Sequence, residues 1–102
     1  MFANYYKLAI PKEYLNKAIA QMCKIQNNLI NNAEGCVKYQ FTQDLENENL
    51  VYLFAMWETK ENYDKNFESR YGEIEIFDKL VKYEVAIIST EQLIISEHKI
   101  VT

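Results

Sequence analysis

Residues 34–69 read EGCVKYQFTQDLENENLVYLFAMWETKENYDKNFES, and this stretch decides the fold. Gly35 marks a turn that leads into an alternating segment, Val37–Phe41, whose odd-numbered side chains are expected to face inward. Leu50–Trp57 is apolar at every position, which predicts a strand covered on both faces. Thr59 is a suitable N-cap for a helix that follows at once. The only Trp therefore lies at a strand end, where pockets tend to form.

The segments before this stretch predict one strand and one long helix. Phe2–Ile10 alternates between two faces, which predicts a strand. Pro11 suits the first turn of a helix, where its missing N–H costs nothing, and Asn31 and Asn32 suit the helix end. The predicted helix has one apolar stripe, made of Leu15, Ala18, Ile19, Met22, Gln26, Leu29 and Ile30.

The segments after this stretch predict a second helix and further strands. Gly72 interrupts the helical pattern, and a second helical piece follows it. Tyr83–Ile88 is predicted to be a strand, and Leu93–Ile95 a further short strand after a break at Thr90 and Glu91. The order strand, helix, strand, strand, helix, strand predicts an α+β fold, a ferredoxin-like βαββαβ antiparallel sheet with its helices on one face. We expect one domain over residues 1–102.

The second face of this sheet predicts self-association. One layer of helices covers one face only, yet Leu50–Trp57 is apolar on both. A large apolar patch is not stable in water on a monomer. We therefore expect a homodimer with the two sheets packed face to face.

Composition excludes several classes of function. The net charge is −4 and Arg70 is the only Arg, so no basic surface for nucleic acid is expected. No apolar run approaches the roughly 20 residues of a membrane helix, and Met1–Tyr6 does not resemble a signal peptide, so we expect a cytoplasmic protein. Cys23 and Cys36 are predicted to be reduced packing residues, and with His98 as the only His we expect no metal site.

Several short motifs resemble those of the antibiotic biosynthesis monooxygenase family. They are Glu34-Gly35-Cys36, Tyr39, Asp44, Trp57-Glu58 and the segment Tyr63–Ser69. The resemblance covers roughly residues 5–95 and implies a dimeric α+β barrel. It also implies a function, because several members oxidise phenols or quinols with O₂ and use neither metal nor flavin. Other members degrade haem or isomerise small signalling molecules.

The resemblance implies catalytic roles for Trp57, Tyr63 and Asn66. Trp57 matches the Trp of the quinone-forming members, and Tyr63 matches their pocket Tyr. A phenol must lose a proton before it passes an electron to O₂, and N–H or O–H donors in a dry pocket can stabilise the resulting anion. Plain packing in the core is the alternative for both aromatic residues.

Three further aromatic residues are candidates for substrate binding. Tyr39 and Tyr52 lie on strands that could face the barrel interior, and Phe67 lies one helical turn after Tyr63. Glu34 and Glu58 are expected to be solvated or capping residues. Ser69 has no His or acid partner at a motif spacing, and Arg70 is expected in a surface ion pair.

Two departures from the family pattern count against an enzyme. Leu53 stands where the quinone-forming members have an Asn, and Asn66 stands where many relatives have a His. An amide cannot accept a proton at neutral pH, so the sequence shows no clear general base. The segment 72–82 contains no His, which disfavours haem.

The leading hypothesis is a cofactor-independent monooxygenase that oxidises a small phenol or quinol. One alternative is a non-catalytic dimer, a small-molecule binder or a stress-related protein, that uses the same pocket for an apolar or aromatic ligand. Another alternative is an isomerase of a small carbonyl compound.

Overall fold

The computed structural model describes residues 1–67, 69 and 71–94. Its elements, in chain order, are β1 (Phe2–Ala9), the 3₁₀ helix η1 (Lys12–Tyr14), α1 (Leu15–Asn32), β2 (Cys36–Gln43), β3 (Leu50–Trp57), α2 (Lys60–Asn66), α3 (Glu73–Leu80), the 3₁₀ helix η2 (Val81–Tyr83) and β4 (Ala86–Ile94). None of the helices in these residues is long and apolar enough to cross a membrane.

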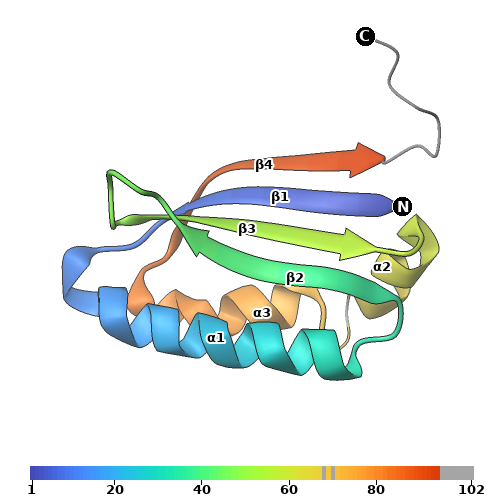
Figure 1. The fold of residues 1–102 in the computed structure, drawn as a ribbon. Helices are drawn as coiled ribbons and strands as arrows, with labels where there is room; N and C mark the ends of the chain where they lie inside the picture. Colours follow the sequence, from blue (N-terminus) through green and yellow to red (C-terminus); the bar gives the residue numbers. More distant parts are fainter. Residues whose placement is uncertain (68, 70, 95–102) are drawn as a thin grey trace, which may run out of the picture.

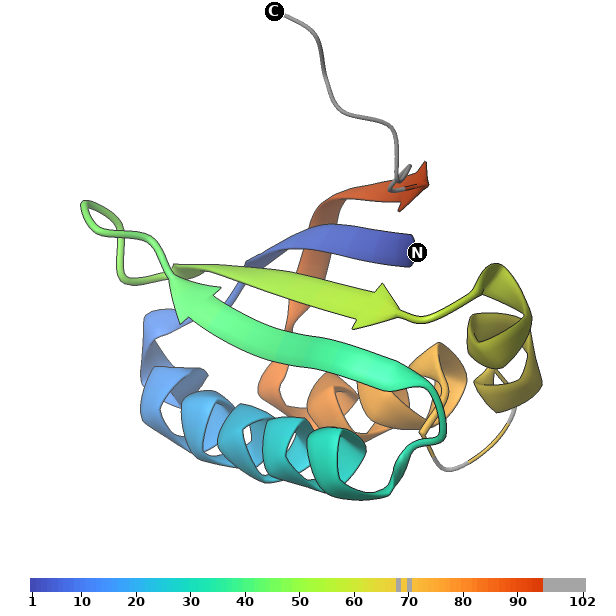
Figure 2. The same cartoon turned by 45° about the vertical axis from the view of Figure 1, so that its right-hand side comes forward.

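The strands form one antiparallel sheet in the order β2-β3-β1-β4. Figures 1 and 2 show α1 and α3 side by side beneath this sheet and α2 at the end of β3. The described part of the chain places no helix on the opposite face. The predicted ferredoxin-like α+β fold with helices on one face is therefore confirmed.

The core lies between the sheet and the helices α1 and α3. Leu8 of β1 and Leu53 of β3 are fully buried from the sheet side, and Met22 of α1 and Leu80 of α3 are buried from the helix side. Burying one such side chain contributes roughly 1.5–3 kcal/mol. This layer fixes the distance between the sheet and the helices and so holds the site at the sheet end.

The buried stripe of α1 differs from the prediction at its C-terminal half. Ile25 is buried, whereas Ile30 is 43% exposed. Gln26, which was expected in the stripe, lies at its edge and accepts a hydrogen bond from the backbone N–H of Phe41 at 2.9 Å. The Gln26 amide therefore hydrogen-bonds the backbone of the edge strand β2, and its neighbour Ile25 is buried in the core instead.

A β-bulge turns Val37 away from the core, contrary to the prediction. Cys36 pairs with Trp57 and Lys38 with Met56, so one residue of β2 is extra between them. Val37 is 44% exposed as a result, while Tyr39 is buried as expected.

The C-terminal strands were predicted wrongly as two segments. β4 is continuous from Ala86 to Ile94 and pairs with β1 along its length. Thr90 and Glu91 do not break it, because an edge strand can point polar side chains into water. Tyr83 is the last residue of η2, and Glu84 caps this helix in a left-handed conformation, φ 55°. Ile95, Arg70 and His98 lie outside the described residues.

β3 divides its side chains between the two faces of the sheet. Val51, Leu53, Ala55 and Trp57 are buried against the helices. Tyr52, Phe54 and Met56 point to the opposite face and remain partly exposed. We call this opposite face the open face. It is apolar at its centre, and the ring centroid of Tyr52 lies 5.9 Å from that of Tyr5.

We predict that two open faces pack together in a homodimer. A specific interface buries on the order of 1,600 Å². Phe54→Arg should produce a monomer in sedimentation experiments, because it places an unpaired charge in the interface and next to Lys38, whose Nζ lies 5.9 Å from the ring of Phe54. Val81→Glu, at an exposed position on η2, is the control and should stay dimeric. A monomeric wild-type chain at micromolar concentration would refute the prediction.

Candidate functional site

The site is a small pocket at the end of the sheet where β3 finishes. Its walls come from β1, β2 and β3 on one side and from α2 and α3 on the other, and its aromatic rings include those of Trp57, Tyr39 and Phe67. The cavity measures about 10 Å³. This is the space of about one water molecule, so an aromatic ligand requires a wall side chain to move.

Local sequence fixes Trp57 at the floor of this pocket. Thr59 follows the strand and caps α2, since its Oγ1 accepts a hydrogen bond from the N–H of Asn62 at 3.0 Å. Gly35, with φ 78°, accepts a hydrogen bond from the N–H of Glu58 at 2.8 Å. A side chain at Gly35 would meet the side chain of Asn62 at 2.4 Å. The turn before β2 and the start of α2 are thus packed against the strand end.

Trp57 presents an indole N–H that has no hydrogen-bond partner among the described residues. The residue is 2% exposed, and its Nε1 is buried. Its ring contacts Tyr63 edge-on, with the ring centroids 6.2 Å apart. Leaving a buried donor unpaired costs about 1–3 kcal/mol. The pocket therefore offers a hydrogen-bond donor that a bound ligand could satisfy.

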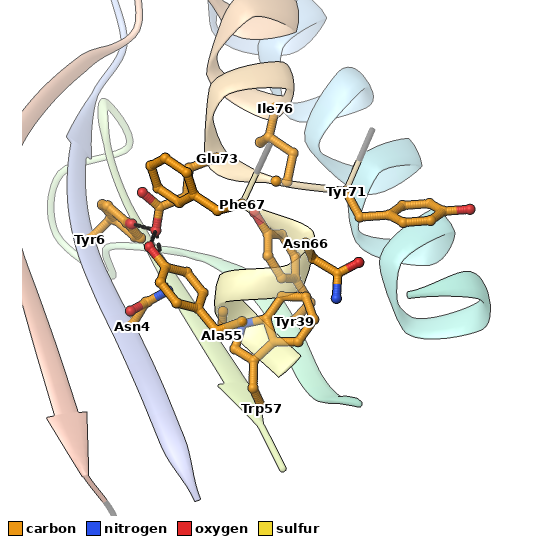
Figure 3. A pocket seen from close by; sticks show the side chains of 12 residues that line it. Asn4, Tyr6, Tyr39, Ala55, Trp57, Asn66, Phe67, Tyr71, Glu73 and Ile76 are labelled. Atoms are coloured by element: carbon orange, nitrogen blue, oxygen red, sulfur yellow. Dashed lines mark hydrogen bonds between the residues drawn. The ribbon is translucent and has the colours of Figure 1, made fainter. Parts of the chain in front are cut away.

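Glu73 is the charged centre of the site. One carboxylate oxygen, Oε1, accepts hydrogen bonds from the Tyr63 hydroxyl at 2.6 Å, from Asn4 Nδ2 at 3.2 Å and from the Tyr6 hydroxyl. In Figure 3 the dashed bonds converge on the Glu73 carboxylate beside Tyr6 and Asn4. The hydrogen bonds thus link β1 and α2 to α3 at a single atom, Glu73 Oε1.

Gly72 allows Glu73 to reach this position. Gly72 is the N-cap of α3, and a Cβ there would lie 1.9 Å from the carbonyl oxygen of Phe67. Any larger residue would push α3 away from the end of α2. Glu73 also lies in the first turn of α3, where a carboxylate interacts favourably with the helix dipole.

The pocket tyrosines are held as neutral phenols. Burial, together with the hydrogen bond to Glu73, raises the pKa of Tyr6 and of Tyr63 well above the usual value. Burial also raises the pKa of Tyr39, and the nearby charge of Glu73 raises it further. At neutral pH these groups can therefore donate hydrogen bonds and do not act as phenolate bases.

The structure brings five of the six predicted site residues together. Trp57, Tyr63, Asn66, Tyr39 and Phe67 all line the pocket. Tyr52 does not join them, because it lies on the open face and donates to Asp44 Oδ1 at 3.1 Å. Successive side chains of a strand point to opposite faces of the sheet. Tyr52 and Trp57 are an odd number of positions apart, so they lie on opposite faces.

Asn66 lines the pocket with an amide that is already engaged. Its Nδ2 donates to the carbonyl of Asn62 at 2.8 Å and to that of Glu34 at 3.4 Å. Ser69 donates from its hydroxyl to the Asn66 carbonyl at 2.8 Å, which makes Ser69 a turn residue. These bonds close the end of α2 and engage the Asn66 Nδ2 group with the backbone.

Sequence reasoning missed Asn4, Tyr6 and Glu73. Asn4 is 2% exposed, and its Oδ1 has no hydrogen-bond partner among the described residues. A polar residue on the inward face of a strand was a signal that could have identified it. Leu53 pairs with Tyr6, and Ala55 pairs with Asn4. The neighbouring strand β1 thus supplies polar groups to the region where β3 itself has only Leu53.

The remaining candidates lie away from the pocket. Glu34 and Glu58 are exposed, as expected. Cys23 is exposed and so is not the packing residue that was predicted; both cysteines are free, and burial raises the pKa of Cys36 to about 11. Within residues 1–67, 69 and 71–94, no group of three His, Cys, Asp or Glu side chains is arranged to hold a metal ion.

Comparison with known proteins identifies one family. The family model described as Antibiotic biosynthesis monooxygenase matches residues 1–71. No curated protein shows a significant match to the chain.

Solved structures share the fold at low sequence identity. A candidate antibiotic biosynthesis monooxygenase of Deinococcus radiodurans is 14% identical, with a TM-score of 0.84 over 100% of this chain and 99% of that one. A similar candidate of Caulobacter crescentus is 12% identical, with a TM-score of 0.78 over 94% and 90%. A conserved protein of Methanosarcina mazei is 22% identical, with a TM-score of 0.70 over 90% and 87%. Identities this low establish the fold alone.

We predict that Glu73→Gln destabilises the fold while Glu75→Gln does not. Both residues lie in the first turn of α3, but Glu75 is exposed. Hydrogen bonds to a charged group are worth roughly 1.5–3 kcal/mol and those to a neutral group about 1, so Glu73→Gln should lower the free energy of unfolding by about 1–2 kcal/mol. Urea unfolding of both variants measures this difference. Equal effects would show that Glu73 acts only through the helix dipole.

We also predict a loss of stability at alkaline pH that depends on the buried tyrosines. Their pKa values are higher in the folded state than the value of about 10 in an unfolded chain. The folded state therefore holds more protons above that pH, and the stabilisation is complete below about pH 10 and lost as the pH rises further. Compared with Tyr39→Phe, the wild type should lose more unfolding free energy between pH 8 and pH 11. An equal loss in both proteins would contradict this account.

Proposed function

The chain belongs to the antibiotic biosynthesis monooxygenase family, and from this premise we propose that it oxidises a small phenol or quinol with O₂ without a cofactor. The observation that carries the proposal is the buried N–H of Trp57, which has no hydrogen-bond partner in the part of the chain that the structure describes and lies in a pocket lined by aromatic rings. An oxygen atom of the substrate is the natural acceptor for this donor.

The proposed reaction needs no external reductant. The substrate hydroxyl loses its proton, and the phenolate passes one electron to O₂, which gives a phenoxyl radical and superoxide. The two combine with formation of a carbon–oxygen bond, and the resulting peroxide anion takes back the proton that the substrate lost. Loss of water from this hydroperoxide gives a quinone. A phenol and O₂ thus yield a quinone and H₂O, with one oxygen atom of O₂ in each product.

Trp57 would act on the charge that develops in this reaction. Its N–H can hydrogen-bond the substrate oxygen and stabilise the phenolate more than the neutral phenol, because the bond to an anion is stronger. The rings around it exclude water, which strengthens that interaction.

Tyr63 and Glu73 would remove the proton. Tyr63 contacts Trp57 and donates its own hydroxyl proton toward Glu73 Oε1 at 2.6 Å. The substrate proton can pass to the Tyr63 oxygen as the Tyr63 proton passes to Glu73. Tyr63 stays neutral throughout, in keeping with its raised pKa. This relay supplies the general base that the sequence did not reveal.

The second candidate function is a non-catalytic binding module. One observation favours it: the Asn66 amide is committed to backbone carbonyls. In that case the pocket would bind a small aromatic molecule without turning it over.

We predict that Trp57→Phe lowers the rate of oxidation by about 10-fold or more, as expected for the loss of one preorganised donor. Oxygen uptake with a panel of hydroquinones measures the rate, and urea unfolding confirms that the variant is folded. Tyr14→Phe, near the opposite end of the helices, is the control and should retain full activity.

Labelled oxygen separates this reaction from simple autoxidation. With ¹⁸O₂ the quinone should carry one labelled oxygen atom, and no hydrogen peroxide should accumulate. No oxygen uptake across the whole panel would refute the monooxygenase proposal and favour the binding module.

A further inference from the structure

A groove lies between α1 and β2, apart from the pocket at the end of β3. It measures about 250 Å³, whereas the pocket beside Trp57 measures about 10 Å³, and no residue lines both. Figures 1 and 2 show α1 running beneath β2, which is an edge strand of the sheet. We call this space the edge groove.

The edge groove is apolar at its base and uncharged at its rim. Met22 of α1 and Val51 of β3 are buried, and the half-buried Ile19 and Phe41 continue this apolar surface. Among the described residues, no charged side chain lines the groove. A carboxylate or ammonium group would lose hydration there without gaining a partner of opposite charge. The edge groove therefore suits a neutral, apolar molecule.

The dimensions and the lining favour a small aromatic molecule. Sites for drug-sized ligands measure roughly 300–1,000 Å³, so the edge groove suits a smaller molecule, such as one substituted ring. The Phe41 ring and the Met22 thioether both line the groove. Aromatic rings and thioether sulfurs make favourable contacts with an aromatic ligand.

Gln26 supplies the edge groove with one hydrogen-bond donor. Its Oε1 accepts the backbone N–H of Phe41 at 2.9 Å, which leaves the NH₂ group of this amide for another partner. No acceptor for this NH₂ group is found among the described residues. The other polar side chains of β2 are engaged: Gln43 donates to the carbonyl of Glu48 at 2.8 Å, and Thr42 donates to that of Tyr52 at 3.3 Å.

We propose that the edge groove is a second binding site, which takes a small neutral aromatic carbonyl compound. The ring of the ligand packs on Met22 and Phe41, and its carbonyl oxygen accepts a hydrogen bond from the Gln26 NH₂ group. This inference goes beyond the proposed function, since no residue of the edge groove takes part in the proposed oxidation.

Methionine methyl groups provide a direct test. Of the three Met residues in the chain, only Met22 lines the edge groove. Protein with ¹³C-labelled Met methyl groups is titrated with acetophenone, and the Met22 cross-peak should shift in a saturable manner. The indole cross-peak of Trp57 reports on the pocket at the end of β3 in the same sample. Benzoate, which is charged, should bind about 10-fold or more weakly than acetophenone.

Gln26→Glu isolates the proposed hydrogen bond. A Glu oxygen still accepts the N–H of Phe41, but an ionised carboxylate has no donor for the ligand. The variant should bind acetophenone about 3-fold or more weakly and should bind ethylbenzene, which has no acceptor, within about 2-fold of the wild type. Gln21→Glu adds the same charge to α1 outside the groove and is the matched control, which should bind both compounds like the wild type.

A second pair of variants tests the location of the site. Cys23 is exposed on α1 and lines the groove, so Cys23→Phe should fill the space and abolish the response of Met22 to acetophenone. Asn31→Phe, at an exposed position on the same helix outside the groove, should retain the response. Urea unfolding of each variant identifies any loss of fold.

The outcomes separate this inference from the proposed function, because none of these titrations involves turnover. A Met22 response that is weakened in Gln26→Glu and kept in Gln21→Glu supports the edge groove, even if the protein takes up no oxygen. A response at Trp57 with none at Met22 overturns the inference, and so does a Met22 response that Gln26→Glu or Cys23→Phe leaves unchanged. A Met22 cross-peak that shifts with protein concentration and not with acetophenone would show that a second copy of the chain covers the groove, which also overturns it.

Discussion

The convergence of three donors on one oxygen of Glu73 holds the site together. Asn4 and Tyr6 come from β1, Tyr63 from α2 and Glu73 from the first turn of α3, so this carboxylate joins the sheet to both helices that follow it. A carboxylate in a partly buried position needs such partners, since an unpaired charge there would be costly. All three donors direct their hydrogen atoms to the same oxygen, Glu73 Oε1, while Asn4 Oδ1 is buried and has no hydrogen-bond partner among the described residues.

This network could not be predicted from the sequence, although the fold could. Alternation in the first strand, the apolar run of β3 and the capping residue Thr59 act locally and are visible in the sequence. Glu73 is 69 positions from Asn4 and 67 from Tyr6, and only the crossover of the chain brings them together. Their proximity depends on Gly72, whose missing side chain lets α3 approach the carbonyl of Phe67.

The errors in the sequence prediction also have tertiary causes. Val37 is exposed because a bulge shifts the register of β2, and Gln26 leaves the buried stripe because its amide bonds to the backbone of Phe41. β4 remains continuous through Thr90 because pairing with β1 outweighs its polar composition. Trp57, Tyr63, Tyr39 and Phe67 line one pocket, whereas Tyr52 lies on the open face, because the sequence prediction did not separate the two faces of β3.

The central claim is that the N–H of Trp57 hydrogen-bonds a substrate oxygen, and one measurement tests it most directly. Trp57 is the only Trp, so its indole N–H gives a single cross-peak in a ¹⁵N-labelled protein. Titration with a diphenol in the absence of O₂ should shift the proton of this cross-peak downfield, as a hydrogen bond forms at Nε1. An indole cross-peak that stays unchanged while the ligand binds would contradict the account.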